Sequence, residues 1–190
     1  MTASQYYKSY VADDTISPLS EELIKTILNY RPMHVLDFGS GSGKHSNILN
    51  REGIVTLAID ISMMNTVRAH AKYDLPFVAC TNETYLGHLA NIDVVFTCSV
   101  LDHIEDVSNI IKHFQRIANK SVVLAETQNS PDEFYYSHDY ERFGFKKLSA
   151  STDIDFRWRS EPPEGDGATY HIWVWNKTNG NSNDTHDDLA

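Results

Sequence analysis

Residues 34–43 have the sequence HVLDFGSGSG, an apolar run that ends in an acid and continues into three glycines spaced two apart. A buried parallel strand that enters a glycine-rich turn and then a helix brings backbone N–H groups and a helix N-terminus to one point. Such a point is suited to hold a small ligand. The stretch therefore predicts an α/β fold with a binding site at the end of this strand.

The segments around this stretch alternate between strand and helix patterns. Helices are expected at 17–29, 44–51, 63–72, 107–117 and 131–142, and strands at 33–38, 54–61, 77–80, 92–98, 121–125, 145–149 and 168–176. This alternation predicts a doubly wound, mostly parallel sheet of seven strands with helices on both faces. Because no helix separates the last two strands, the final strand is expected to be antiparallel.

The chain length of 190 residues and the hydrophobic content of 41% fit one domain with a core of its own. Within the chain, residues 1–30 are expected to form an N-terminal cap or lid and a lead-in helix. Residues 31–176 would form the ligand-binding domain, and the polar residues 177–190 a disordered tail.

Composition argues against two classes of partner. The net charge of −10 disfavours a nucleic acid, because an acidic protein repels phosphate backbones. No run approaches the ~18 to 20 apolar residues of a membrane span, and the first residues lack a signal pattern. A cytoplasmic protein without a membrane partner is expected, with Cys80 and Cys98 as buried thiols in a reducing compartment.

Two known glycine motifs differ from this turn. A phosphate-binding P-loop needs glycine and serine or threonine at positions that hold Phe38 and His45. A dinucleotide site needs a third glycine where this chain has Lys44. The P-loop is therefore disfavoured, whereas an oxidoreductase that uses a nicotinamide dinucleotide is weakened and stays an alternative.

The residues from Asp37 to Gly43 match the pattern D-x-G-x-G-x-G at the end of a first strand. In this motif the chain resembles the class I S-adenosylmethionine-dependent methyltransferases, which have a Rossmann-like, seven-stranded fold. The glycines let the backbone approach a ligand closely, and an acid suits a cationic amino group better than a pyrophosphate. The resemblance covers roughly residues 30–176. It implies that 31–176 form the methyltransferase domain, with S-adenosylmethionine as cofactor.

The resemblance also implies a set of cofactor-binding residues. Asp60 closes the second strand, where the family carries an acid that accepts hydrogen bonds from both ribose hydroxyls. Thr81 and Asn82 would lie near the adenine, although polar loop residues are equally expected there. Residues 98–104, CSVLDHI, are similar to the family loop that lines the cofactor and the acceptor. The full set is Asp37, Gly39, Ser40, Gly41, Gly43, Asp60, Ile61, Thr81, Asn82, Cys98 and Ser99.

Methyl transfer needs alignment of donor and acceptor, and removal of a proton where the acceptor still carries one. His103 is the first candidate for that proton because an imidazole titrates near neutral pH, and Asp102 is its neighbour. The alternative is that one of the two binds the backbone or caps the next helix near Glu105 and Asp106. The histidines show no further ligand spacing, so no metal is expected.

The expected acceptor is a small molecule. Methyltransferases that act on nucleobase amines or glutamine amides carry an Asn/Asp/Ser-Pro-Pro-aromatic tetrapeptide after the fourth strand, and this chain has Thr97-Cys98-Ser99-Val100 there. Candidate lid or acceptor contacts are Tyr6, Tyr7, Tyr10, Tyr135, Tyr136 and Arg157. Packing of the aromatics on the sheet and solvation of an edge strand would explain the same residues. A protein that binds the cofactor without catalysis is a further alternative.

Overall fold

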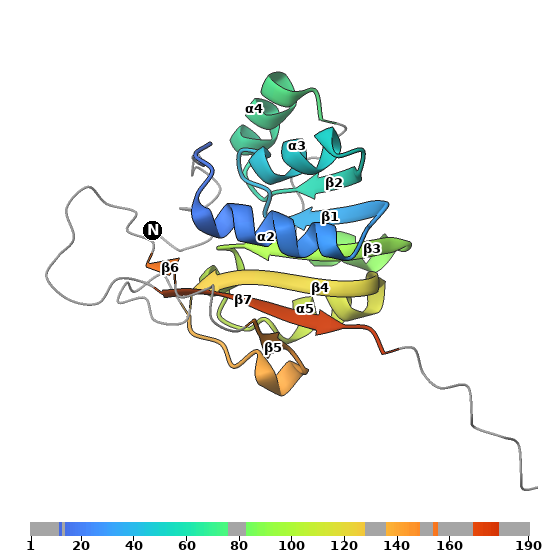
Figure 1. Ribbon diagram of the computed structural model, residues 1–190, viewed down its shortest axis with the longest axis vertical. Coiled ribbons are helices and arrows are strands. Elements are labelled where there is room, and N and C mark those ends of the chain that lie inside the picture. The colour runs from blue at the N-terminus through green and yellow to red at the C-terminus, as the bar shows by residue number, and fades with distance from the viewer. Residues whose placement is uncertain are drawn as a thin grey trace, which may run out of the picture.

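The computed structural model describes residues 12, 14–75, 83–127, 136–148, 154–155 and 169–178. These residues form one sheet with helices on both faces (Figure 1). Helix α2 (Pro18–Asn29) crosses one face, and α5 (Ser108–Ile117) lies on the other. The α/β fold predicted from the sequence is therefore confirmed.

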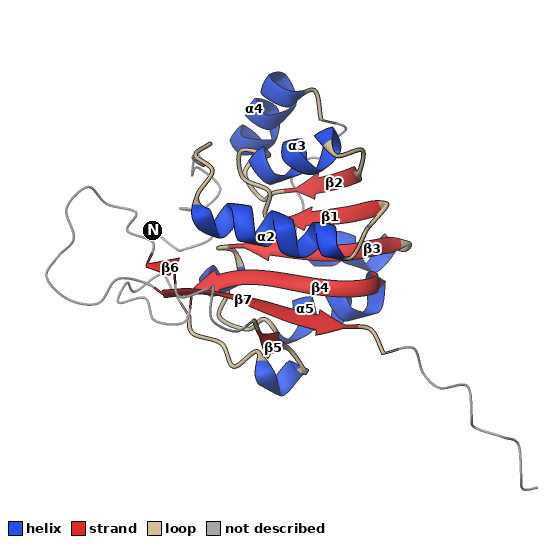
Figure 2. Cartoon of the chain, viewed as in Figure 1, coloured by secondary structure: helices blue, strands red, loops and turns tan. Residues whose placement is uncertain are grey.

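The strands with parallel pairing are β1 (His34–Phe38), β2 (Val55–Ile59), β3 (Ile92–Cys98) and β4 (Ala118–Thr127). The last strand, β7 (Thr169–Asn176), runs antiparallel to β4, as predicted. Two short strands, β5 (Lys146–Lys147) and β6 (Ile154–Asp155), pair with β7. The main order is β2-β1-β3-β4-β7-β5, so the parallel strands all end at one edge of the sheet (Figure 2).

Helices α3 (Lys44–Arg51) and α4 (Met63–Tyr73) follow β1 and β2, and the short 3₁₀ helices are η1 (Glu83–His88), η2 (Leu101–His103) and η3 (Glu141–Phe143). The start of α2 follows from its sequence. The Ser17 hydroxyl accepts a hydrogen bond from the Ser20 N–H at 3.1 Å, and Pro18 occupies the first helical position. These residues fix where the helix begins.

Two apolar cores lie on opposite faces of the sheet, and neighbouring residues of β1 belong to different cores. Leu36 is in the same core as Phe114 of α5, whereas Val35 is in the core that contains Leu23 of α2. A strand buried on both faces must be apolar on both, which explains the run at 34–38. Asp37 interrupts the run and is still buried.

The described residues form seven paired strands, but they do not confirm the seven that the sequence predicts. The strand expected at 77–80 lies outside the described residues, and the short strand β6 at 154–155 was not predicted. Strand β4 is also longer than the predicted 121–125, because extended backbone begins at Ala118, directly after α5.

The helix predicted at 131–142 is wrong for its described part. Residues 136–140 have no regular structure, and residues 141 and 142 belong to the 3₁₀ helix η3. This segment is hydrogen-bonded to η2. The Tyr136 N–H donates to Asp102 O at 2.7 Å, and His138 Nε2 bonds to Leu101 O at 2.9 Å. Tyr140 is fully buried. Tertiary contacts therefore replace the helical hydrogen bonds that the composition favoured.

Candidate functional site

The glycine turn lies at the carboxyl edge of the sheet between β1 and α3. Gly39, Gly41 and Gly43 have φ values of +76°, +54° and +78°, a region that favours glycine. The N–H groups of Gly39 and Ser40 donate to Ile59 O at 2.8 and 3.0 Å. These bonds tie the turn to the end of β2.

Asp60 follows β2 and faces the turn. Its Oδ2 accepts a hydrogen bond from the Gly41 N–H at 2.8 Å, and its Oδ1 accepts one from the Ser62 N–H at 2.7 Å. Burial raises the pKa of this carboxyl, against the effect of these hydrogen bonds. The structure thus brings Asp60 together with the glycine turn, as the sequence predicted.

Asp37, in β1, is the second carboxyl beside the turn. It is 1% exposed, and its Oδ2 accepts a hydrogen bond from the Ser46 hydroxyl at 2.6 Å. Desolvation raises the pKa of Asp37 to about 7; the Ser46 bond opposes the rise, and the charge of Asp60 adds to it. Two buried acids therefore flank the turn, and both favour positive or hydrogen-bond-donating neighbours.

The loop after β3 begins with a strained residue. Ser99 has φ of +54°, and its N–H donates to Ala125 O at 2.9 Å. Its hydroxyl lies 3.2 Å from the Tyr170 hydroxyl and 3.4 Å from Asp102 Oδ2. Non-glycine residues in this conformation cost energy and are concentrated at functional sites.

Asp102 and His103 lie side by side on η2. His103 Nε2 is 3.5 Å from Asp102 Oδ1, which has no hydrogen-bond partner among the described residues. The Asp102 side chain is fully buried, and that of His103 is 12% exposed. Neither residue caps α5, whose N-cap Val107 has no side-chain cap bond. The Asp102 carboxyl does bind the backbone, because it accepts a hydrogen bond from the Thr127 N–H. The arrangement suits a carboxyl that orients an imidazole.

Glu126, near the end of β4, was missed by the sequence analysis. Its Oε2 accepts hydrogen bonds from the N–H groups of Val100, Leu101 and Asp102 at 3.0, 3.1 and 3.3 Å. Its Oε1 accepts one from the Thr97 hydroxyl at 2.5 Å. Burial raises the pKa of Glu126 to about 7 against these bonds, and burial and the charge of Glu126 raise the pKa of Asp102. The available signal was an acid in an apolar strand, as at Asp37.

The family follows from a sequence comparison. A model described as a methyltransferase domain matches residues 5–179. The chain belongs to this methyltransferase family. This confirms the resemblance to the class I S-adenosylmethionine-dependent methyltransferases that the glycine turn predicted. A comparison with curated proteins found no significant match.

Solved structures share the fold of this methyltransferase. Magnesium protoporphyrin IX methyltransferase (ChlM) from Synechocystis PCC 6803 with bound SAH is 16% identical, with a TM-score of 0.66 over 92% of this chain and 98% of that one. TehB from Haemophilus influenzae is 15% identical, with a TM-score of 0.69 over 93% and 67%. A SAM-dependent methyltransferase from Archaeoglobus fulgidus is 15% identical, with a TM-score of 0.59 over 85% and 95%.

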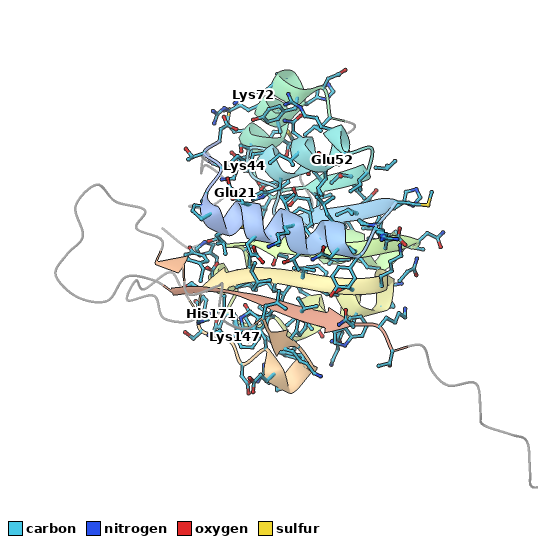
Figure 3. All side chains as sticks on the ribbon, viewed as in Figure 1. Glu21, Lys44, Glu52, Lys72, Lys147 and His171 are labelled. Atoms are coloured by element: carbon cyan, nitrogen blue, oxygen red, sulfur yellow. The ribbon has the colours of Figure 1, made fainter. Side chains whose placement is uncertain are left out.

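The described part of the N-terminal segment lies against the glycine turn of the methyltransferase. The Ala12 N–H donates to Asn65 Oδ1 at 3.0 Å, and a Cβ added to Gly41 would come 2.9 Å from Ala12 Cβ. Lys44 Nζ donates to Thr15 O at 2.6 Å, and Lys72 pairs with Asp14 at 2.7 Å (Figure 3 labels both lysines). The cap predicted for residues 1–30 stays a prediction.

The remaining predicted residues of the methyltransferase are only partly described. Ser40 and Cys98 lie in the turn and at the end of β3, Ile61 follows Asp60, and Tyr136 is half-buried beside Asp102. Outside the described residues lie Tyr6, Tyr7, Tyr10, Cys80, Thr81, Asn82, Tyr135, Arg157 and the chain from 179 onward. In the part that the structure describes, no helix has both the length and the apolar composition needed to cross a bilayer.

Proposed function

We propose that this S-adenosylmethionine-dependent methyltransferase transfers the methyl group to a small-molecule acceptor. The observation that supports methyl transfer most directly is the pair of buried carboxyls, Asp37 and Asp60, beside a turn of three positive-φ glycines. The small-molecule acceptor is supported by the net charge of −10 and by Thr97-Cys98-Ser99-Val100 at the end of β3. One solved structure of the same fold is a magnesium protoporphyrin IX methyltransferase.

The residues present fit the cofactor. S-adenosylmethionine offers an ammonium group and two ribose hydroxyls as hydrogen-bond donors, and the turn is flanked by two carboxyl groups whose oxygens can accept them. Gly39, Gly41 and Gly43 bring no side chain of their own to the turn, and a Cβ added to Gly41 would come 2.9 Å from Ala12 Cβ. Asp37 would hold the amino end and Asp60 the ribose. When bound, the cofactor supplies a sulfonium methyl group for transfer.

His103 is the residue that we assign to proton removal. Its ring lies at the same edge of the sheet as the turn, and Asp102 Oδ1, 3.5 Å from Nε2, is placed to orient the imidazole. Asp102 is fully buried and lies beside the imidazole, so we assign it to act through His103. In this assignment, the imidazole accepts the proton that leaves the acceptor.

Asp60→Ala is expected to weaken S-adenosylhomocysteine binding by about 1.5 to 3 kcal/mol, because charge-assisted hydrogen bonds to the ribose are lost. Isothermal titration calorimetry measures the change. Asp93→Ala is the matched control: Asp93 accepts hydrogen bonds from the N–H groups of Met33 and His34, at the opposite end of β1. Equal affinity in the Asp60 variant and the wild type would refute the ribose assignment.

His103→Ala is expected to slow methyl transfer by about 10² to 10⁴-fold for an acceptor that must lose a proton. Cofactor affinity should stay unchanged, because the imidazole serves the acceptor. Transfer of labelled methyl groups and calorimetry with S-adenosylhomocysteine measure the two effects. If rate and affinity fall by the same factor, His103 is structural.

Titration of the purified protein with S-adenosylhomocysteine, NAD and NADP tests the proposed function. We expect binding of S-adenosylhomocysteine and none of either dinucleotide. Affinity for a dinucleotide alone would overturn the proposal in favour of an oxidoreductase. A panel of small-molecule acceptors then separates an enzyme from a protein that binds the cofactor without turnover.

A further inference from the structure

Glu126 receives an unusual set of donors. Its Oε2 lies within 3.0 to 3.3 Å of three consecutive backbone N–H groups, those of residues 100–102, and its Oε1 accepts the Thr97 hydroxyl. Consecutive N–H groups that point to one place form an anion-binding nest. Here the anion is a side chain of the protein itself.

The burial of Glu126 is explained by this nest and not by packing. The Glu126 side chain is fully buried in β4, and Val122 and Leu124 of the same strand belong to one apolar core. Burial of a carboxylate is costly unless hydrogen bonds compensate for the lost water. An apolar residue would avoid that cost, but it would leave the three N–H groups without their acceptor.

The loop that Glu126 holds connects the two halves of the site. Val100 packs on the glycine turn, since a Cβ added to Gly39 would come 2.3 Å from Val100 Cγ2. Two residues later, Asp102 lies beside His103. Glu126 Oε2 therefore holds both the backbone of Val100, which contacts the glycine turn, and the backbone of Asp102, which lies next to His103.

We propose that Glu126 is a positioning residue for methyl transfer, which acts by holding the backbone of residues 100–102 between the glycine turn and His103. This inference rests on the proposed function. Glu126 does not touch the cofactor or the acceptor in this assignment. Its effect reaches them through the loop.

The test compares Glu126→Gln, which keeps an acceptor oxygen, with Glu126→Leu, which keeps the volume and removes it. Amide hydrogen exchange of residues 100–102 and the affinity for S-adenosylhomocysteine are the two readouts, with exchange in β1 as the measure of global stability. In Glu126→Leu, loop exchange should rise and affinity fall about 10-fold or more, with β1 unchanged. Glu126→Gln should show about a threefold effect, because a neutral acceptor is weaker. Asp93→Asn should leave both readouts as in the wild type.

Loop exchange and affinity that stay at wild-type values in the folded Glu126 variants would overturn the inference. A rise in exchange that is equal in the loop and in β1 would also overturn it, since Glu126 would then be merely structural. If the leucine variant does not fold, the glutamine variant decides by the same readouts. A wild type that fails to bind S-adenosylhomocysteine would refute the proposed function, while loop exchange still tests Glu126.

Discussion

Gly39→Ala is expected to lower the free energy of unfolding by about 2 to 5 kcal/mol, measured by urea denaturation. The backbone at Gly39 has φ of +76°, which costs a residue with a Cβ about 1 to 2 kcal/mol. The new Cβ would also lie 2.3 and 2.8 Å from the two methyl groups of Val100, a stiff β-branched side chain. Overpacking of this kind costs a further 1 to 3 kcal/mol, roughly.

Gly53→Ala is the matched control for this prediction. Gly53 has a similar φ of +81°, but a Cβ there would meet nothing within 4 Å. The control should lose only the backbone contribution, about 1 to 2 kcal/mol. Adding Val100→Ala to Gly39→Ala should restore part of the packing loss. Equal losses in the two single variants would contradict the contact between Val100 and the turn.

Asp37→Asn is expected to gain stability relative to the wild type as the pH rises, by about 2 to 4 kcal/mol between about pH 4 and about pH 8. In the folded protein the pKa of Asp37 is raised to about 7, from an ordinary value of 3.8. Between these two values the unfolded chain releases the proton while the folded protein keeps it. The wild type therefore loses the contribution of Asp37 as the pH rises through about 7, whereas asparagine does not ionise.

The difference between variant and wild type is the quantity to measure, because other groups titrate in the same range. Burial lowers the pKa of His45 to about 3, so the unfolded chain binds a proton there that the folded protein does not, and stability rises with pH. Asp93→Asn is the control, since the pKa of Asp93 is lowered and its contribution is lost only toward acid pH. A difference for Asp37→Asn that stays flat across this range would show that Asp37 is ionised in the folded protein.

The glycine turn and Asp60 could be predicted because their signals are local. Gly39, Gly41 and Gly43 occupy positive-φ positions next to a strand that is apolar on both faces. Asp60 closes the neighbouring strand, and parallel pairing of β1 with β2 brings it to the turn. Spacing along the chain therefore predicts proximity wherever consecutive strands are neighbours in the sheet.

The roles of Glu126 and of residues 136–140 could not be predicted, because their partners are distant in the chain. Glu126 binds N–H groups some 25 residues away, and only the pairing of β3 with β4 brings them together. The segment before η3 has a helical composition, yet its contacts with η2 determine its path. Local patterns contain no information on such long-range hydrogen bonds.

At Ser99, the residue type that would relax the backbone differs from the one that supplies a hydroxyl to the site. Glycine would relax the φ of +54°, and it would also remove the hydroxyl that lies between Tyr170 and Asp102. A search for thermostable variants would thus favour the substitution that depletes the site of a polar group. Serine at position 99 keeps this hydroxyl at the site on a strained backbone.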